Sequence, residues 1–143
     1  MNKQDYKSYA EKKSPNSPLG VNMLKAFLIG GLICTLGEGV RQFYTSRGLT
    51  LDEVAAATAI TMVFLGVFLT AIGVYDSIAK HAGAGTLVPI TGFANAVSSP
   101  AIEYKSEGLV LGVGAKMFII AGPVIVYGTI ASVIAGLIYY FFF

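Results

Sequence analysis

The segment from Lys80 to Pro100 combines two properties that limit how the chain can fold. Between His81 and Glu103 there is no Asp, Glu, Lys or Arg, so this segment can enter a lipid bilayer. The same segment contains residues that weaken or interrupt helical hydrogen bonds, namely Gly83, Gly85, Pro89, Gly92 and Pro100. Broken backbone at membrane depth is tolerated only where protein or water covers it. We therefore predict a broken segment over 82–102 that lines a pathway.

The composition of the whole chain indicates an integral membrane protein. Hydrophobic residues make up 55% of the chain and charged residues only 13%, which is unlike a soluble domain. We predict an all-α membrane protein with three to four transmembrane helices. If 82–102 crosses the bilayer, there are four crossings and both termini lie on one side. If it is re-entrant, there are three crossings and the C-terminus lies on the opposite side. We favour the re-entrant alternative, although the charges on its flanks fit either.

The remaining helices can be placed from charge and apolar runs. Residues 1–20 form a polar tail, and the lysines before and at the start of the first apolar run place it in the cytoplasm by the positive-inside rule. The helical membrane domain then covers 21–143. Its predicted helices are 21–44, 51–76 and 109–143, with a capping box at Thr50-x-x-Glu53 starting the second one.

Small residues recur on the helices at spacings that suit close packing. Gly66 and Gly73 lie seven residues apart in the second helix, and Gly122 and Gly136 fall on a common face of the last one. Small residues allow helix backbones to approach closely in membranes. We expect these four glycines to pack against other helices.

Glu38 is an ionisable residue within a predicted membrane helix, where a charge is costly unless it faces protein or water. It shares a helical face with Gly31, Cys34 and Arg41. One interpretation is a pore-lining or proton-coupled carboxylate. The other is an ion pair with Arg41, less than one turn away, near the membrane boundary. Both remain open at this point.

Other polar residues have similar alternatives. Lys80 and His81 either bind an anion or are simply solvated at the membrane surface. Asn95 and its hydroxyl-bearing neighbours either replace a solute's water shell or satisfy backbone groups freed by glycine and proline. No Cys/His cluster has metal-ligand spacing, and no phosphate loop or catalytic triad is recognisable. We expect no metal, no cofactor, no enzymatic activity and no nucleic-acid partner.

Three blocks of sequence resemble a known family: 30–34, 82–96 and 99–123. They are similar to the stage V sporulation protein A membrane family, and the resemblance covers nearly the whole chain. The block Gly92-Phe-Ala-Asn95 within 82–96 is especially specific. The polar N-terminal extension places the chain nearer to the AC group of this family than to its AEb group.

The resemblance implies a channel subunit that moves dipicolinic acid, as its calcium chelate, across the inner membrane of bacterial endospores. Uptake would occur during sporulation and release during germination, with mechanosensitive activity. The expected partners are the AEb membrane subunit, the soluble AD subunit and the lipid bilayer, in a hetero- or homo-oligomer. We place six residues at the pore or gate: Gly83, Gly85, Pro89, Gly92, Phe93 and Asn95. The candidate contacts to an anionic solute are Lys80, His81 and Lys116.

Two other classes of function remain. A proton-coupled small-solute transporter could use Glu38 as its coupling carboxylate. A non-conducting assembly subunit would instead depend on the small residues of its helix faces for binding partners.

Overall fold

The computed structural model describes residues 5–6, 9, 13 and 17–142, and these residues form helices joined by short turns, with no strand among them. The predicted all-α class is therefore confirmed. Three helical stretches of the described residues are long and apolar enough to cross a membrane: Leu19–Ser46, Leu51–Ala71 and Leu109–Phe142. Most of the tail predicted at 1–20 lies outside the described residues.

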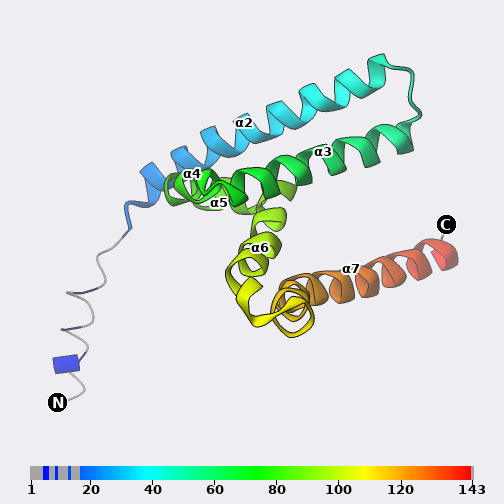
Figure 1. Ribbon diagram of the computed structural model, residues 1–143. Coiled ribbons are helices and arrows are strands. Elements are labelled where there is room, and N and C mark those ends of the chain that lie inside the picture. Colours follow the sequence, from blue (N-terminus) through cyan, green and yellow to red (C-terminus); the bar gives the residue numbers. More distant parts are fainter. Residues whose placement is uncertain (1–4, 7–8, 10–12, 14–16, 143) are drawn as a thin grey trace.

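Two long helices form an antiparallel hairpin (Figure 1). They are α2 (Leu19–Ser46) and α3 (Leu51–Ala71), joined by a four-residue turn. The predicted capping box is present at the start of α3, where the Thr50 amide donates to Glu53 Oε2 over 2.9 Å. We call the end where α2 begins and α3 ends the base of the hairpin, and the opposite end the tip.

The structure divides the helix predicted at 51–76. It ends at Ala71, and α4 (Val74–Ala82) begins after Gly73, whose φ is +72°. Glycine adopts this left-handed conformation without steric cost, so the chain changes direction there. Gly73 therefore acts at a helix boundary, and the continuous helix over 51–76 is not observed.

The segment after α4 enters the hairpin and turns back halfway along it. The short helix α5 (Ala84–Leu87) lies against α2, with Gly85 on the backbone of Ala26. Pro89 then reaches the level of Cys34 and Met62, which lie near the middles of α2 and α3. The next helix, α6 (Ile90–Glu103), crosses α3 and leads out of the hairpin to the corner before α7 (Figure 1).

Contacts along α6 establish this return. Thr91 and Ala94 pack against Gly66, and Asn95 is hydrogen-bonded to Thr70 near the end of α3, while Ala101 and Ile102 line a hollow together with Ala71. Both ends of the broken segment thus lie at the base of the hairpin. The structure has the geometry of the re-entrant alternative.

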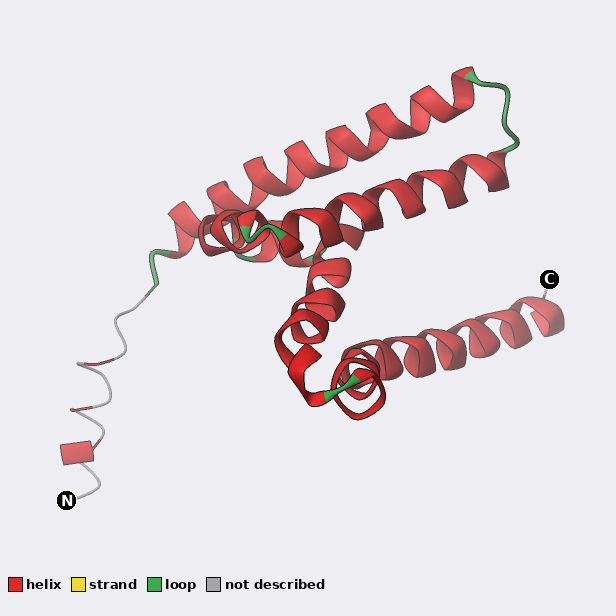
Figure 2. Cartoon of the chain, in the orientation of Figure 1, coloured by secondary structure: helices red, strands yellow, loops and turns green. Residues whose placement is uncertain are grey.

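A helical corner then leads to the last helix. It consists of a 3₁₀ turn, η1 (Tyr104–Glu107), and a π-helical stretch, η2 (Leu109–Gly114), which continues into α7 (Ala115–Phe142). The helix predicted over 109–143 thus begins as π-helix. Figure 2 shows that loops occupy little of the chain, and α7 runs beside the hairpin as a separate arm.

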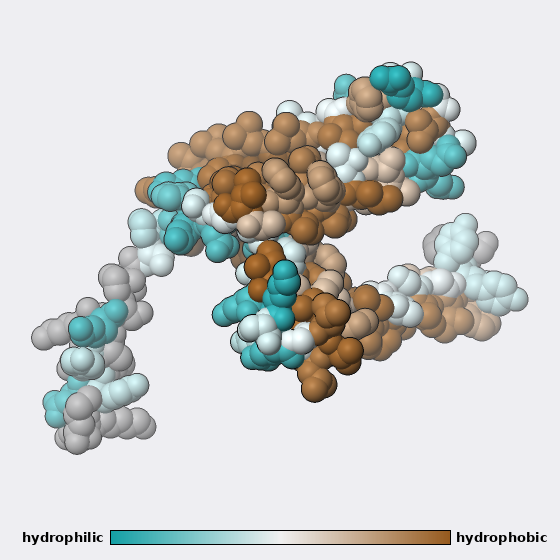
Figure 3. All heavy atoms as spheres, in the orientation of Figure 1, coloured by the Kyte–Doolittle hydropathy of each residue, from teal (hydrophilic) through white to brown (hydrophobic). Residues whose placement is uncertain are grey.

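The distribution of polar residues on the surface fits a hairpin whose long axis crosses the bilayer. In Figure 3 hydrophilic residues gather near the base, at the tip and at the corner between α6 and α7, whereas hydrophobic residues cover the helices between them. Polar bands at both ends of an apolar body are what a bilayer requires of a spanning protein.

Candidate functional site

The reversal of the broken segment is held by a buried tyrosine. Tyr75 on α4 is 3% exposed, and its hydroxyl donates to the carbonyl oxygen of Thr86 over 2.9 Å. The same hydroxyl is hydrogen-bonded to Thr91 Oγ1 over 3.0 Å. Thr86 lies before the reversal and Thr91 after it, so Tyr75 joins the two arms. The backbone carbonyl of Thr86 is thereby paired within the protein, as membrane depth favours.

Two of the predicted pore glycines instead fill tight backbone contacts. A Cβ on Gly92 would overlap the carbonyl oxygen of Thr86 and lie 2.8 Å from that of Leu87. A Cβ on Gly85 would overlap the carbonyl oxygen of Ala26 and lie 2.9 Å from its Cα. Both glycines are buried. Only glycine allows these close approaches between the two arms and between α5 and α2.

The other predicted pore residues have mixed surroundings. Asn95 is half-buried, and its side-chain oxygen accepts a hydrogen bond of 2.8 Å from the Thr70 hydroxyl of α3. Phe93 is exposed and lies at an apolar hollow between α3, α6 and α7. Gly83 has a φ of +50° and joins α4 to α5. Pro89 is half-buried at the innermost point of the reversal.

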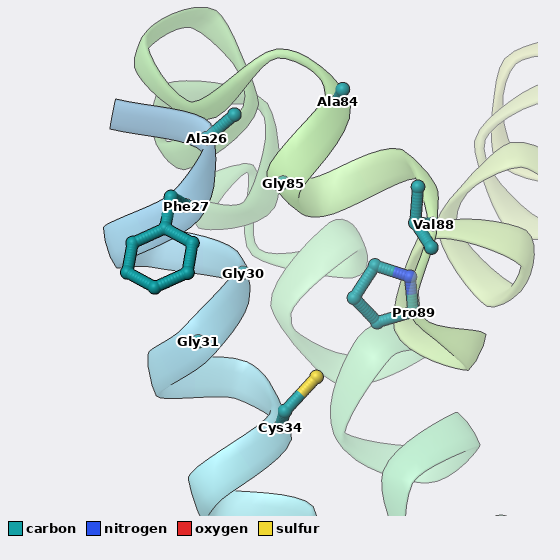
Figure 4. A pocket seen from close by; sticks show the side chains of 9 residues that line it. All are labelled: Ala26, Phe27, Gly30, Gly31, Cys34, Ala84, Gly85, Val88 and Pro89. Atoms are coloured by element: carbon teal, nitrogen blue, oxygen red, sulfur yellow. The ribbon is translucent and has the colours of Figure 1, made fainter. Parts of the chain in front are cut away.

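Beside the reversal is an apolar hollow of about 330 Å³. Figure 4 shows Phe27 and Cys34 of α2 on one side of it, with Val88 and Pro89 of the broken segment on the other. A neighbouring hollow, between α2 and α3, includes Thr58 together with Cys34 and Pro89. The hydroxyl oxygen of Thr58 is buried and has no hydrogen-bond partner, which is uncommon for a buried polar group.

Lys80 and His81 lie together at the base. With Asn22 of α2 and Gly83 they line a hollow of about 400 Å³. His81 Nδ1 is 2.9 Å from the Ser77 carbonyl oxygen, so its Nδ1–H can donate there and leave Nε2 towards the surroundings. The structure thus brings together two of the three residues predicted to contact an anion.

Lys116 and Glu38 lie elsewhere. Lys116 Nζ sits 4.0 Å from the centroid of the Tyr104 ring at the start of α7, a cation–π contact. Glu38 lies in the tip half of α2 and pairs with Arg41 through two hydrogen bonds of 2.7 and 2.8 Å. Gln42 donates to the same carboxylate over 3.3 Å. The ion-pair interpretation of Glu38 thus matches the observed geometry.

The four glycines predicted to pack against helices differ in their environments. A Cβ on Gly66 would come within 2.9 Å of the Thr91 carbonyl oxygen, because α6 crosses α3 at this point. A Cβ on Gly73, Gly122 or Gly136 would meet nothing within 4 Å. Of these four glycines, only Gly66 lies at a close helix crossing within the described residues. In the described residues no group of three or more His, Cys, Asp or Glu side chains could hold a metal ion.

Sequence reasoning did not single out Tyr75, Thr70 or Gly30. Gly30 is the residue of α2 that faces Gly85, with a Cβ position 3.1 Å from the Gly85 carbonyl oxygen. Tyr75 pairs with residues 11 and 16 positions away across the reversal. Residues at these separations are not neighbours on one helix, so periodicity could not predict their hydrogen bonds. The one available signal was a tyrosine close in sequence to a segment rich in glycine and threonine.

Comparison with known proteins identifies the family. A family model described as SpoVAC/SpoVAEB sporulation membrane protein matches residues 22–138. The chain belongs to this family. The Bacillus subtilis (strain 168) protein named Stage V sporulation protein AC is 48% identical over 142 residues, covering 98% of this chain and 94% of the relative. No solved structure matches the chain.

Family membership confirms the predicted resemblance. It also makes this chain a sporulation membrane protein, since that is how the SpoVAC/SpoVAEB family is described. The match covers α2, α3, the whole broken segment and nearly all of α7. The re-entrant segment is thus part of the family's shared region.

Proposed function

We propose that this SpoVAC/SpoVAEB protein is a subunit of a membrane channel for dipicolinic acid, carried as its calcium chelate. In this proposal it serves uptake during sporulation and release during germination, with gating that responds to membrane tension. The protein would reside in the inner membrane of the forespore and spore, with its N-terminus in the cytoplasm. Its partners would be an AEb membrane subunit and a soluble AD subunit.

The observation that carries this proposal is the uncharged segment that turns back halfway along the hairpin. Its second arm, α6, begins at Pro89 with no side chain capping its first amide groups. A helix N-terminus carries partial positive charge and attracts anionic groups, and broken helices use such ends at membrane solute sites. The unpartnered hydroxyl of Thr58 lies at a hollow beside this end.

The spanning helices suggest that the channel lumen is shared between chains. None of the residues of α2 or α7 is buried in this chain. A single copy therefore leaves much of the surface of both helices to lipid or neighbouring subunits. In our proposal each chain contributes its re-entrant segment to a lumen that other subunits complete.

Flux of calcium dipicolinate through proteoliposomes containing the chain and its AEb partner tests the proposal. We expect Asn95→Leu to reduce flux strongly while the complex assembles normally. Thr35→Leu is the matched control, because Thr35 is exposed on α2 and its hydroxyl bonds only to its own helix. Unchanged flux through an assembled Asn95→Leu complex would show that α6 does not line the conduction pathway at Asn95.

A further inference from the structure

A crevice between α2 and the broken segment runs from the base of the hairpin to its middle. It consists of the polar hollow at Lys80 and the apolar hollow at Cys34, which adjoin at Ala26 and Ala84. One flank of α2 continues through both hollows, presenting Met23 and then Phe27. The crevice is therefore polar at one end and apolar at the other.

The length of this crevice matches one leaflet of a bilayer. From Asn22 to Cys34, α2 rises by about 18 Å at 1.5 Å per residue. Half of the hydrocarbon core of a bilayer is about 15 Å. A groove that starts at the membrane surface and ends at the bilayer centre has the dimensions of a phospholipid acyl chain.

The charges at the base end suit an anionic head group. Lys80 is exposed and forms no ion pair with any described residue, although Asp76 lies one turn before it on α4. His81 presents Nε2, because its Nδ1 is directed to the Ser77 carbonyl oxygen. Asn22 adds a side-chain amide from the first turn of α2. The Lys80 ammonium and the Asn22 amide can donate hydrogen bonds to phosphate oxygens, with the lysine supplying charge, whereas His81 lines the hollow beside them.

We propose that this crevice binds one acidic phospholipid. The phosphate lies against Lys80 and Asn22, and one acyl chain follows α2 past Phe27 towards Cys34 and Pro89. The bound lipid then lines α5 and fills the apolar hollow beside the reversal. It contacts the first arm of the re-entrant segment along its length, so its presence supports the position of that arm.

The test is lipid retention by the full-length protein, measured by native mass spectrometry after reconstitution with equal amounts of phosphatidylglycerol and phosphatidylcholine. We expect the unmodified protein to retain phosphatidylglycerol preferentially. Lys80→Gln should lower this retention about fivefold, the usual contribution of one basic residue at an anionic membrane surface. Lys105→Gln, which removes another exposed lysine outside the crevice, is the control and should leave retention unchanged.

A second variant tests the apolar half. Gly31 lines the hollow, and a Cβ there meets nothing within 4 Å, so Gly31→Leu should occupy the groove without disturbing the helix contacts. It should reduce phosphatidylglycerol retention while circular dichroism remains unchanged. Equal retention by the unmodified protein, Lys80→Gln and Gly31→Leu would overturn the proposal. Retention of inorganic phosphate or free dipicolinate at Lys80 with no preference for phosphatidylglycerol would also overturn it, and would make the hollow a free-anion site.

Discussion

The re-entrant region, meaning the broken segment and the part of α3 that it packs against, differs from α7 in the surroundings of its glycines. In the re-entrant region Gly66, Gly85 and Gly92 each fill a backbone contact that a Cβ would disrupt. In α7 a Cβ on Gly122 or Gly136 meets nothing within 4 Å. The absence of charge does not distinguish the two regions, since both are uncharged over long stretches. The difference lies in what the chain itself places beside each glycine.

This contrast distinguishes the contacts that form within one chain from the surfaces that remain for lipid or other subunits. The hairpin and broken segment pair several of their polar groups internally, through Tyr75, Thr70 and Asn95. Along α7 most side chains are exposed, including Tyr127 at 74%. In a bilayer these faces contact lipid or neighbouring helices, whose association depends on close packing of small residues.

The largest expected effect compares one glycine from each region. Gly92→Leu should destabilise the fold by at least about 3 kcal/mol, the upper part of the range for overpacking, because the obstructing atoms are backbone oxygens of Thr86 and Leu87. Gly136→Leu should change the stability of the isolated chain by less than about 0.5 kcal/mol. Detergent-induced unfolding in mixed micelles, followed by circular dichroism, measures both.

Equal stabilities for these two variants would contradict the difference between the regions. If Gly136→Leu prevents assembly with other subunits while the isolated chain stays folded, the result would support a contact between α7 and another subunit at Gly136.

A smaller loss of stability is expected when the Tyr75 hydroxyl, which joins the two arms of the broken segment, is removed. Tyr75→Phe leaves the ring buried but removes the hydrogen bonds to Thr86 and Thr91. Loss of a buried partner costs about 1–3 kcal/mol, and the same unfolding assay should detect it. Tyr127→Phe on α7 removes an exposed hydroxyl and is the matched control, with no expected change. Identical losses for the two variants would show that Tyr75 does not hold the reversal.

The smallest effect is expected at Glu38. Glu38→Gln removes the charge of an exposed ion pair with Arg41, and exposed pairs contribute little to stability. Flux of calcium dipicolinate should therefore be nearly unchanged, and it should not depend on a pH gradient. Loss of pH-driven transport in this variant would support the proton-coupled transporter instead.

Much of the helical architecture is predictable because its causes are local. The apolar runs predict α2, α3 and α7, and Thr50 with Glu53 predicts the start of α3. The break at Gly73 was missed, because a glycine within an apolar run fits a packing stripe as well as a helix end. The environment of Gly92 was also unpredictable, since its contacts with Thr86 and Leu87 exist only after the chain reverses.

Cysteine labelling tests most directly whether the broken segment turns back. In a Cys34→Ser background, single cysteines are introduced at Ser46, Ser77 or Ser106, all of which are exposed. Ser46 lies at the tip of the hairpin, Ser77 at its base, and Ser106 in the corner that follows α6. A membrane-impermeant maleimide added to one side of oriented vesicles should label Ser77→Cys and Ser106→Cys together, and Ser46→Cys only from the other side. Labelling of Ser106→Cys together with Ser46→Cys would mean that 82–102 crosses the bilayer, and would contradict the re-entrant fold.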